Sequence, residues 1–317
     1  DAIVKDPIIL FMAELGVIIL LLQIGLETRL GDLVSVGARA SLVGTVGIIV
    51  PFALGAFVAG PLVLPGMEFN AYLFLGATLA ATSVGITGRV FRDLGRLKMP
   101  EAQIVLGAAV IDDVLGLVIL AVVSSLVEAG TVSIGEVVLI IVKAVAFLGG
   151  SIAIGRAMAP HLLRWASRLD NSHSMLFSLV LVAGLFMAWL AHAVGLAAII
   201  GAFAAGLLFE PVFLKEFETP KVVQDIEKLM PVAVDPEKQP DFKRVLERHT
   251  HRQHEHLLEP IGYFFVPVFF VLTGMQVDLT ALADPQAVAV ALALTAAAIA
   301  GKLVAGFAAG KGRNPWL

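Results

Sequence analysis

The chain has 317 residues, of which 58% are hydrophobic and 15% charged, and its mean hydropathy is +0.92. Soluble domains contain roughly 45–50% apolar and about 25% charged residues, so this composition excludes an ordinary soluble protein and predicts an all-α polytopic membrane protein. The net charge of −4 is small and identifies no partner, and the absence of cysteine excludes disulfides and thiolate metal sites.

Both ends of the chain lie close to apolar segments. The chain begins with DAIVKDPIIL, without an initiator methionine or the charged start of a signal peptide. It ends with KGRNPWL, just after another apolar run. We expect the sequence to be a piece of a longer protein.

Nine segments have the composition of membrane-spanning helices, which need roughly 20 mostly apolar residues. In chain order they are residues 8–26, 37–58, 70–89, 102–127, 132–155, 173–192, 195–209, 261–278 and 285–309.

Basic residues alternate along the loops between these segments. The loops after the first, third, fifth and seventh segments, and the tail after the ninth, carry Lys and Arg. The other loops carry acidic residues and neither Lys nor Arg. The positive-inside rule then places the N-terminus outside and the C-terminus in the cytoplasm. The basic residues of the inner side are Arg29, Arg39, Arg89, Arg92, Arg96, Lys98, Arg156, Arg164, Arg168, those of 215–252, Lys311 and Arg313.

Two of the segments carry a single ionisable residue at depth. Glu14 lies in the outer half of the first segment, and Lys143 lies near the middle of the fifth. An intramembrane ionisable side chain is a candidate for function. We favour an interhelical hydrogen bond or a subunit contact for both, with a direct transport role as the alternative.

The third segment contains the stretch LGATLAATSVGITGRVF. Between Thr82 and Gly88 it is rich in Thr, Ser, Gly and β-branched residues, which form helices poorly. Broken helices in transporters place backbone carbonyls and hydroxyls at the substrate site, so we predict a break at this point, in the cytoplasmic half. The alternative is an intact helix whose small residues permit close packing.

The fourth segment, VLGAAVIDDVLGLVILAVV, places two aspartates side by side among apolar residues and glycines. At 1.5 Å per residue, Asp112 lies roughly 4 Å to the cytoplasmic side of the helix midpoint, and Lys302 of the ninth segment lies roughly 7 Å to that side. Pairing of these two charges would offset much of their desolvation. Adjacent residues on a helix point about 100° apart, so Asp113 faces a different space, for which a water-filled ion pathway is the obvious interpretation.

The seventh loop, residues 210–260, is the only sizeable soluble piece. Its sequence FKRVLERHTHRQHEHLLEP is typical of a short amphipathic helix, and its basic face suits the anionic inner membrane surface. A metal site and a pH-sensing role remain alternatives, because histidine serves both purposes. The histidines are His249, His251, His254 and His256.

Five stretches in order along the chain resemble the cation:proton antiporter-2 superfamily, most closely its NapA-type sodium/proton antiporters. They are ATSVGITGRVFRDLG, PEAQIVLGAAVIDDVLGLVILAVV, GLAAIIGAFAAGLLF, PVFFVLTGMQVDL and AGKLVAG. The resemblance covers nearly the whole chain except the seventh loop, which is longer than expected for this family.

The resemblance implies an NhaA/NapA-like inverted-repeat fold of thirteen helices, of which nine are expected in this sequence. Two would precede residue 1 and two would follow residue 317, including a second broken helix with an acidic residue. A mobile core bundle would move against a scaffold that forms a homodimer. The implied domains are a core of 37–128 with 285–310, a linker helix of 131–157, and a scaffold of 1–36 and 173–283 that includes loop 210–260.

The resemblance also assigns the site. Asp113 would bind the monovalent cation, Asp112 would pair with Lys302, and Thr82 and Ser83 would contribute oxygens from the broken helix. A buried carboxylate avoids bare charge by holding either a proton or a cation, so competition at Asp113 would produce exchange.

The expected function is therefore cation/proton antiport by alternating access, electrogenic because of the double aspartate. Na⁺ is the expected cation, with Li⁺ or K⁺ as alternatives. We expect a multi-pass homodimer in the lipid of the cell (inner) membrane, without enzyme activity, cofactor or nucleic-acid partner.

Three other functions remain open. A Kef-type potassium efflux system or channel tends to have Gln-Asp at positions 112–113 and normally brings a nucleotide-binding domain. An intramembrane aspartyl protease takes its two aspartates from different helices. A bile-acid-type symporter has a similar fold and an organic substrate.

Overall fold

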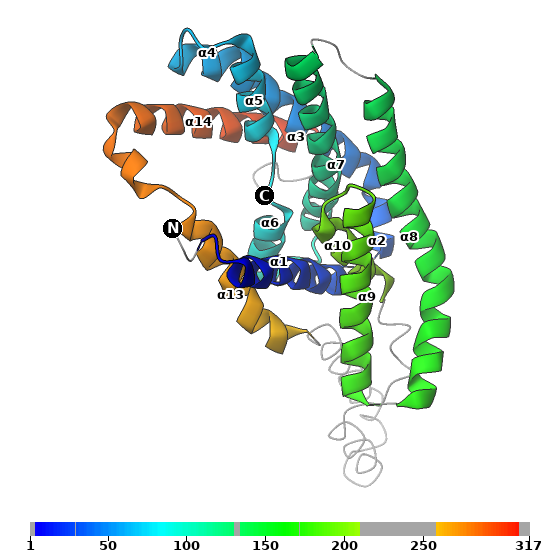
Figure 1. Ribbon diagram of the computed structural model, residues 1–317. Coiled ribbons are helices and arrows are strands. Elements are labelled where there is room, and N and C mark those ends of the chain that lie inside the picture. The colour runs from blue at the N-terminus through cyan, green and yellow to red at the C-terminus, as the bar shows by residue number, and fades with distance from the viewer. Residues whose placement is uncertain (1–3, 29, 130–133, 171, 210–257, 311–317) are drawn as a thin grey trace, which may run out of the picture.

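The computed structural model describes residues 4–28, 30–129, 134–170, 172–209 and 258–310. Within these ranges the chain is all-α, with helices and turns and no strand (Figure 1). The elements are α1 (Pro7–Glu27), α2 (Leu30–Ser35), α3 (Gly37–Ala53), the π-helix η1 (Leu54–Ala59), α4 (Gly60–Val63), α5 (Phe69–Ala80), α6 (Val84–Asp93), α7 (Pro100–Ala129), α8 (Ile134–Leu169), α9 (His173–Ala193), α10 (Ala198–Leu208), α13 (Glu259–Met275), the 3-10 helix η3 (Leu279–Ala283) and α14 (Pro285–Phe307).

Each of the nine predicted segments corresponds to helix in the structure. Among the described residues, seven helices have the length and apolar composition to cross a membrane, counting α3–η1–α4 and α5–α6 as one span each. The other two, α10 and α13, are apolar but shorter, with 11 and 17 residues. The prediction of an all-α multi-pass protein is confirmed.

Two predicted segment ends are wrong. The third segment continues to Asp93, so Arg89 and Arg92 lie in α6 rather than in a loop. The fifth continues to Leu169, so the basic residues after 155 lie in α8. The reason is that hydropathy follows only the apolar part of a helix, whereas arginine and other polar residues with good helix propensity extend it.

α1 is the most enclosed of the seven helices that are long and apolar enough to cross a membrane. Its residues from Ile19 to Leu26 are all buried, as expected for a helix inside a bundle. α10, α13, α9 and α6 pack around it. At its crossing with α10, Gly25 meets Gly206, and a Cβ atom on either would collide with the facing backbone. Small residues at this crossing therefore allow the two helices to touch through their main chains.

A second group of helices consists of α3, η1, α5, α7 and α14. α3 packs against α7, α14 and α5, and α14 also packs against η1. Figure 1 shows α14 beside α4 and α5, and α8 along an outer edge of the molecule. α6 packs against both α1 and α7, so it joins the second group to the helices around α1.

The outer surface of these helices is strongly apolar. Large hydrophobic side chains are exposed along α8 and α9, and they include Trp165 at 60%, Phe186 at 56% and Trp189 at 61% exposure. Extended apolar surface of this kind marks contact with another protein or with a membrane. Together with the apolar helices, it is the surface expected of a protein embedded in lipid.

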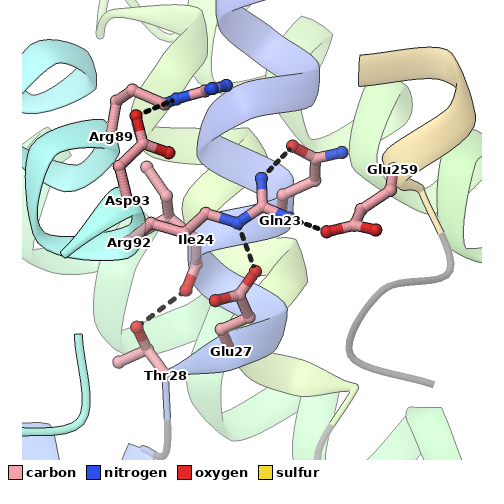
Figure 2. Close-up of polar contacts among 8 residues, drawn as sticks. All are labelled: Gln23, Ile24, Glu27, Thr28, Arg89, Arg92, Asp93 and Glu259. Atoms are coloured by element: carbon pink, nitrogen blue, oxygen red, sulfur yellow. Dashed lines mark hydrogen bonds and ion pairs between the residues drawn. The ribbon is translucent and has the colours of Figure 1, made fainter. Parts of the chain in front are cut away.

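A partly buried polar cluster connects α6 to α1 and α13 (Figure 2). Arg92, in the last turn of α6, pairs through Nε with Glu27 Oε1 at 2.7 Å. Its Nη1 donates to Gln23 Oε1 at 2.8 Å, and its Nη2 donates to Glu259 Oε1 at 3.0 Å. Three nitrogens of one guanidinium thus bind two residues of α1 and one of α13.

Candidate ion-binding site

The predicted break in the third segment is confirmed. α5 ends at Ala80, residues 81–83 are extended, and α6 begins at Val84. Ser83 caps α6, because its Oγ accepts a hydrogen bond from the N–H of Ile86 at 3.3 Å. The last carbonyls of a helix lack intrahelical donors, so the break leaves the Ala80 carbonyl available to another group.

A second backbone carbonyl is released in α3. Pro51 lies inside this helix, where proline lacks the N–H that would bond the carbonyl four residues earlier. That carbonyl belongs to Gly47, a buried residue on the side of α3 that faces α14.

Both carbonyls bind the ammonium group of Lys302 on α14. Lys302 Nζ donates to the Gly47 carbonyl at 2.7 Å and to the Ala80 carbonyl at 3.1 Å. It also donates to Thr82 Oγ1 in the break. An ammonium group has three donors, so these three oxygens satisfy its hydrogen-bonding capacity.

Lys302 also pairs with Asp112, as the sequence predicts. The distance between Lys302 Nζ and Asp112 Oδ2 is 3.5 Å, and the side chains are 36% and 4% exposed, respectively. The pair joins α14 to α7 across the broken helix. It therefore brings together three of the five predicted site residues: Asp112, Lys302 and Thr82.

The carboxylates of Asp112 and Asp113 differ in their partners. Asp112 lies against Lys302 and Thr82, with its Oδ2 3.5 Å from Lys302 Nζ, whereas the buried Oδ2 of Asp113 has no hydrogen-bond partner within the described part of the chain. Asp112, Thr82 and Lys302 line a cavity of about 520 Å³. Asp113 is not among the lining residues, in keeping with the roughly 100° between neighbouring side chains on a helix.

Other predicted candidates lie outside this cavity. The Ser83 hydroxyl serves as the cap of α6. Glu14 on α1 and Lys143 on α8 are exposed, and neither forms an ion pair with another described residue. The histidines of 249–256 and their predicted amphipathic helix lie outside the described residues.

The sequence predicted the break that exposes the Ala80 carbonyl, but not the Gly47 carbonyl or the proline that exposes it. The available signal was Pro51 in the middle of an apolar segment, because proline inside a helix always releases a carbonyl. The Arg92 cluster was also missed. Its signal was Gln23, a polar residue in the apolar first segment, now found at 1% exposure.

The chemistry of this site suits a small cation or a proton. A buried carboxylate with no hydrogen-bond donor is costly unless a cation or a proton neutralises it. Carboxylate, carbonyl and hydroxyl oxygens are the ligands that hard cations prefer. The site offers such oxygens in two adjacent places, one of which already holds the ammonium of Lys302.

Comparison with known proteins agrees with this chemistry. The family model described as "Sodium/hydrogen exchanger, transmembrane" matches residues 2–233 and 243–314. The chain is 36% identical to the high-affinity Na⁺/H⁺ antiporter NhaS3 of Synechocystis, over 96% of this chain and 58% of that protein. It is 34% identical to the Na⁺/H⁺-K⁺ antiporter GerN of Bacillus cereus, over 92% and 64%. The chain thus spans about three fifths of the length of these relatives.

The fold has a counterpart among solved structures. The sodium proton antiporter MjNhaP1 of Methanocaldococcus jannaschii superposes with a TM-score of 0.56 at 18% identity, covering 96% of this chain and 66% of that one. This match establishes the antiporter fold, and the family model covers nearly all of the sequence. The chain therefore belongs to the transmembrane sodium/hydrogen exchanger family.

Proposed function

We propose that the protein exchanges a monovalent cation for protons across the membrane, with Na⁺ as the first cation to test. One observation carries this proposal: the intramembrane carboxylate of Asp113 has a buried oxygen without a hydrogen bond, and its neighbour Asp112 pairs with Lys302 at a helix break. Similarity to the Na⁺/H⁺ antiporter NhaS3 supports Na⁺, and similarity to the Na⁺/H⁺-K⁺ antiporter GerN supports both Na⁺ and K⁺.

In the proposed mechanism Asp113 holds the transported cation or a proton, but not both at once. Oxygens of the break at Thr82 and Ser83 would complete the cation shell, which requires their hydroxyls to exchange their present partners, Lys302 and the N–H of Ile86, for the cation. Alternating exposure of this single site to the two sides of the membrane then exchanges one ion for the other. The process needs no cofactor and no covalent chemistry, and adjacent aspartates on one helix are poorly placed to share a water as a protease pair does.

Asp112 and Lys302 provide a second titrating pair. While the carboxylate is ionised it stabilises the ammonium at 3.5 Å, and protonation of the carboxylate weakens that hold. A cycle in which this pair also exchanges a proton moves more positive charge in one direction than in the other. We therefore propose electrogenic exchange.

The two packing groups support the proposed division into domains. Helices α3, η1, α5, α7 and α14 would form the mobile core, 37–128 with 285–310, which also contains α6. The helices α1, α9, α10 and α13 would belong to the scaffold, 1–36 and 173–283. Residues 131–157, the first part of α8, would link them. We further propose a homodimer in the cell (inner) membrane, with the N-terminus outside and the C-terminus cytoplasmic.

Reconstitution tests the function directly. The purified protein in vesicles, given a preset proton gradient, should release protons when Na⁺ is added, with Li⁺ and K⁺ added separately to rank the cations. Vesicles with the Asp113→Asn variant serve as the control. Cation flux without proton movement would favour a channel of Kef type, and a response to organic anions would favour a symporter.

A further inference from the structure

The acceptors of Lys302 are unusual for a residue inside a helical bundle. Two of them are backbone carbonyls, Gly47 and Ala80, and both belong to apolar helices. In an intact helix each interior carbonyl already accepts the N–H four residues later. A carbonyl that has lost this N–H partner is left with its full accepting capacity, and both acceptors of Lys302 are of this kind. The Ala80 carbonyl is explained by the break that follows it.

The Gly47 carbonyl is explained by a single residue, Pro51. Proline at this position has no N–H to offer to Gly47, four residues earlier, and its place is inside α3 rather than at an end. Lys302 Nζ lies 2.7 Å from this carbonyl, so the ammonium occupies the position that a helical N–H would otherwise satisfy. An unsatisfied buried carbonyl would be costly, which makes this bond favourable for both partners.

The residue before Lys302 makes the approach possible. Gly301 is buried, and a Cβ atom added to it would lie 2.6 Å from Cγ and 2.9 Å from both Cδ and N of Pro51. Real Cβ atoms do not come so close, so any larger residue would push α14 away from α3. The proline ring thus packs directly on the glycine, and the lysine next to that glycine reaches the freed carbonyl.

We propose that Pro51 and Gly301 are positioning residues for Lys302. Pro51 supplies the acceptor by withholding an N–H, and Gly301 brings the α14 backbone close enough for Lys302 to use it. Because the two carbonyls are neutral, they hold the ammonium without neutralising it. The lysine then remains in place when Asp112 takes up a proton and its attraction is lost. This last consequence rests on the proposed exchange, whereas the positioning itself does not.

A thermal double-mutant cycle tests the positioning. In a Lys302→Met background the Gly47 carbonyl has lost its lysine donor and position 51 offers no N–H, so Pro51→Ala supplies a helical donor and should raise the melting temperature. In the parent the same N–H competes with the lysine, so the gain should be smaller by about 3 °C or more.

Pro267→Ala is the matched control for this cycle. Pro267 lies inside α13, which packs on α1 and does not line the cavity. Its effect should be the same with lysine or methionine at position 302. If Pro51→Ala also changes the melting temperature by the same amount with lysine or methionine at position 302, the proline does not act through the lysine and the proposal fails.

Transport measurements test whether the missing N–H is the active feature. Pro51→Ala should lower Na⁺-driven proton release about tenfold, the effect of losing one hydrogen bond of roughly 1.4 kcal/mol at the site. Introducing lactic acid at position 51 replaces the amide with an ester, which has neither ring nor N–H. This variant should restore most of the exchange rate, because the Gly47 carbonyl is again left for Lys302.

The outcomes test the positioning of Lys302 separately from the proposed exchange function. An ester variant as slow as Pro51→Ala would show that the proline ring matters rather than the absent N–H, and would end the proposal. Equal loss of exchange in Pro267→Ala would do the same. If the parent shows no exchange at all, the proposed function fails, and the thermal cycle still decides whether Pro51 positions Lys302.

Discussion

Asp112 and Asp113 are neighbours in the chain with different surroundings. Asp112 is 4% exposed and pairs with Lys302, whereas Asp113 has no ion pair in the described part of the chain and does not line the cavity. The charge of Asp112 is therefore compensated by Lys302, whereas the charge of Asp113 is left for a transported cation or a proton. We therefore expect Asp113 to bind the cation and Asp112 to hold Lys302, although the two residues are adjacent on one helix.

Asp113→Asn should abolish exchange and leave folding intact, because it removes the carboxylate assigned to the cation while keeping the size of the side chain. Proton release on addition of Na⁺ to vesicles measures the effect, and the elution profile of the purified protein monitors folding. Asp93→Asn is the control, since Asp93 is exposed and pairs only at the surface of α6 with Arg89. Near-normal exchange in the Asp113→Asn vesicles would refute the assignment.

The Asp112–Lys302 pair should show coupled stability. Asp112→Ala and Lys302→Ala should each lower the melting temperature, and the double variant should cost clearly less than their sum, because removing the second charge relieves the first. Each single variant should lose less unfolding free energy than the roughly 3–5 kcal/mol expected for breaking a fully buried pair, because the Lys302 side chain is 36% exposed. Strictly additive melting shifts would dismiss the pair as an energetic unit.

Among the elements, the short helix α6 has a distinct place. Its N-terminus follows the break that holds Thr82 against Lys302, and its last turn carries Arg92 into the cluster with α1 and α13. Between these ends, Gly85 and Gly88 lie against apolar side chains of α1, including Ile24. α6 is thus fastened at both ends, to the ion-binding site at one and to the α1 group at the other.

Arg92→Gln should destabilise the protein far more than Arg89→Gln. The Arg92 side chain is 13% exposed, and its loss removes the ion pair at 2.7 Å to Glu27, which is 10% exposed, together with the hydrogen bonds to Gln23 and Glu259, at a cost of about 2 kcal/mol or more. Arg89 lies on the same helix, but its pair with Asp93 is a surface pair worth about 0–1 kcal/mol. Thermal unfolding of the two variants side by side makes the comparison. Similar melting temperatures would show that the cluster does not hold α6.

Local patterns predicted some of these elements and missed others. The Thr-Ser-Gly run after Ala80 indicated the break because poor helix formers act locally. The Asp112–Lys302 pair followed from depth, which hydropathy measures. The partners of Arg92 could not be predicted, because nothing in the sequence indicates that the end of α6 meets α1 and α13. Such contacts depend on which helix faces cross, and one sequence does not encode that in any local pattern.

At the scale of the whole molecule, the arrangement in the membrane can be tested with single cysteines, because the chain contains none. Glu68 and Arg96 are exposed and lie in connections at opposite ends of the α5–α6 span. A cysteine at position 68 should react with an impermeant thiol reagent added outside intact cells, and one at position 96 should react only after the membrane is opened. The reverse pattern would invert the proposed orientation.

The number and order of the helices were predictable because each crossing of the lipid needs its own apolar stretch. The way in which the helices pack into two groups was not predictable from the sequence. The crossing of α1 with α10 depends on Gly25 and Gly206, which lie far apart in the sequence and look like any other glycines in apolar segments. The same limit applies to Gly301, whose importance is visible only against Pro51.

The use of main-chain oxygens to hold Lys302 has a genetic consequence. A carbonyl is supplied by whatever residue occupies its position, so no missense change at Gly47 or Ala80 deletes the acceptor itself. The mutations that disrupt the binding of Lys302 should instead fall at Pro51 and Gly301, which make no hydrogen bond to the lysine. In a saturation mutagenesis screen for growth under sodium stress, position 301 should reject every side chain. Position 51 should tolerate none of the other encoded residues well, since each of them would return an N–H to the helix.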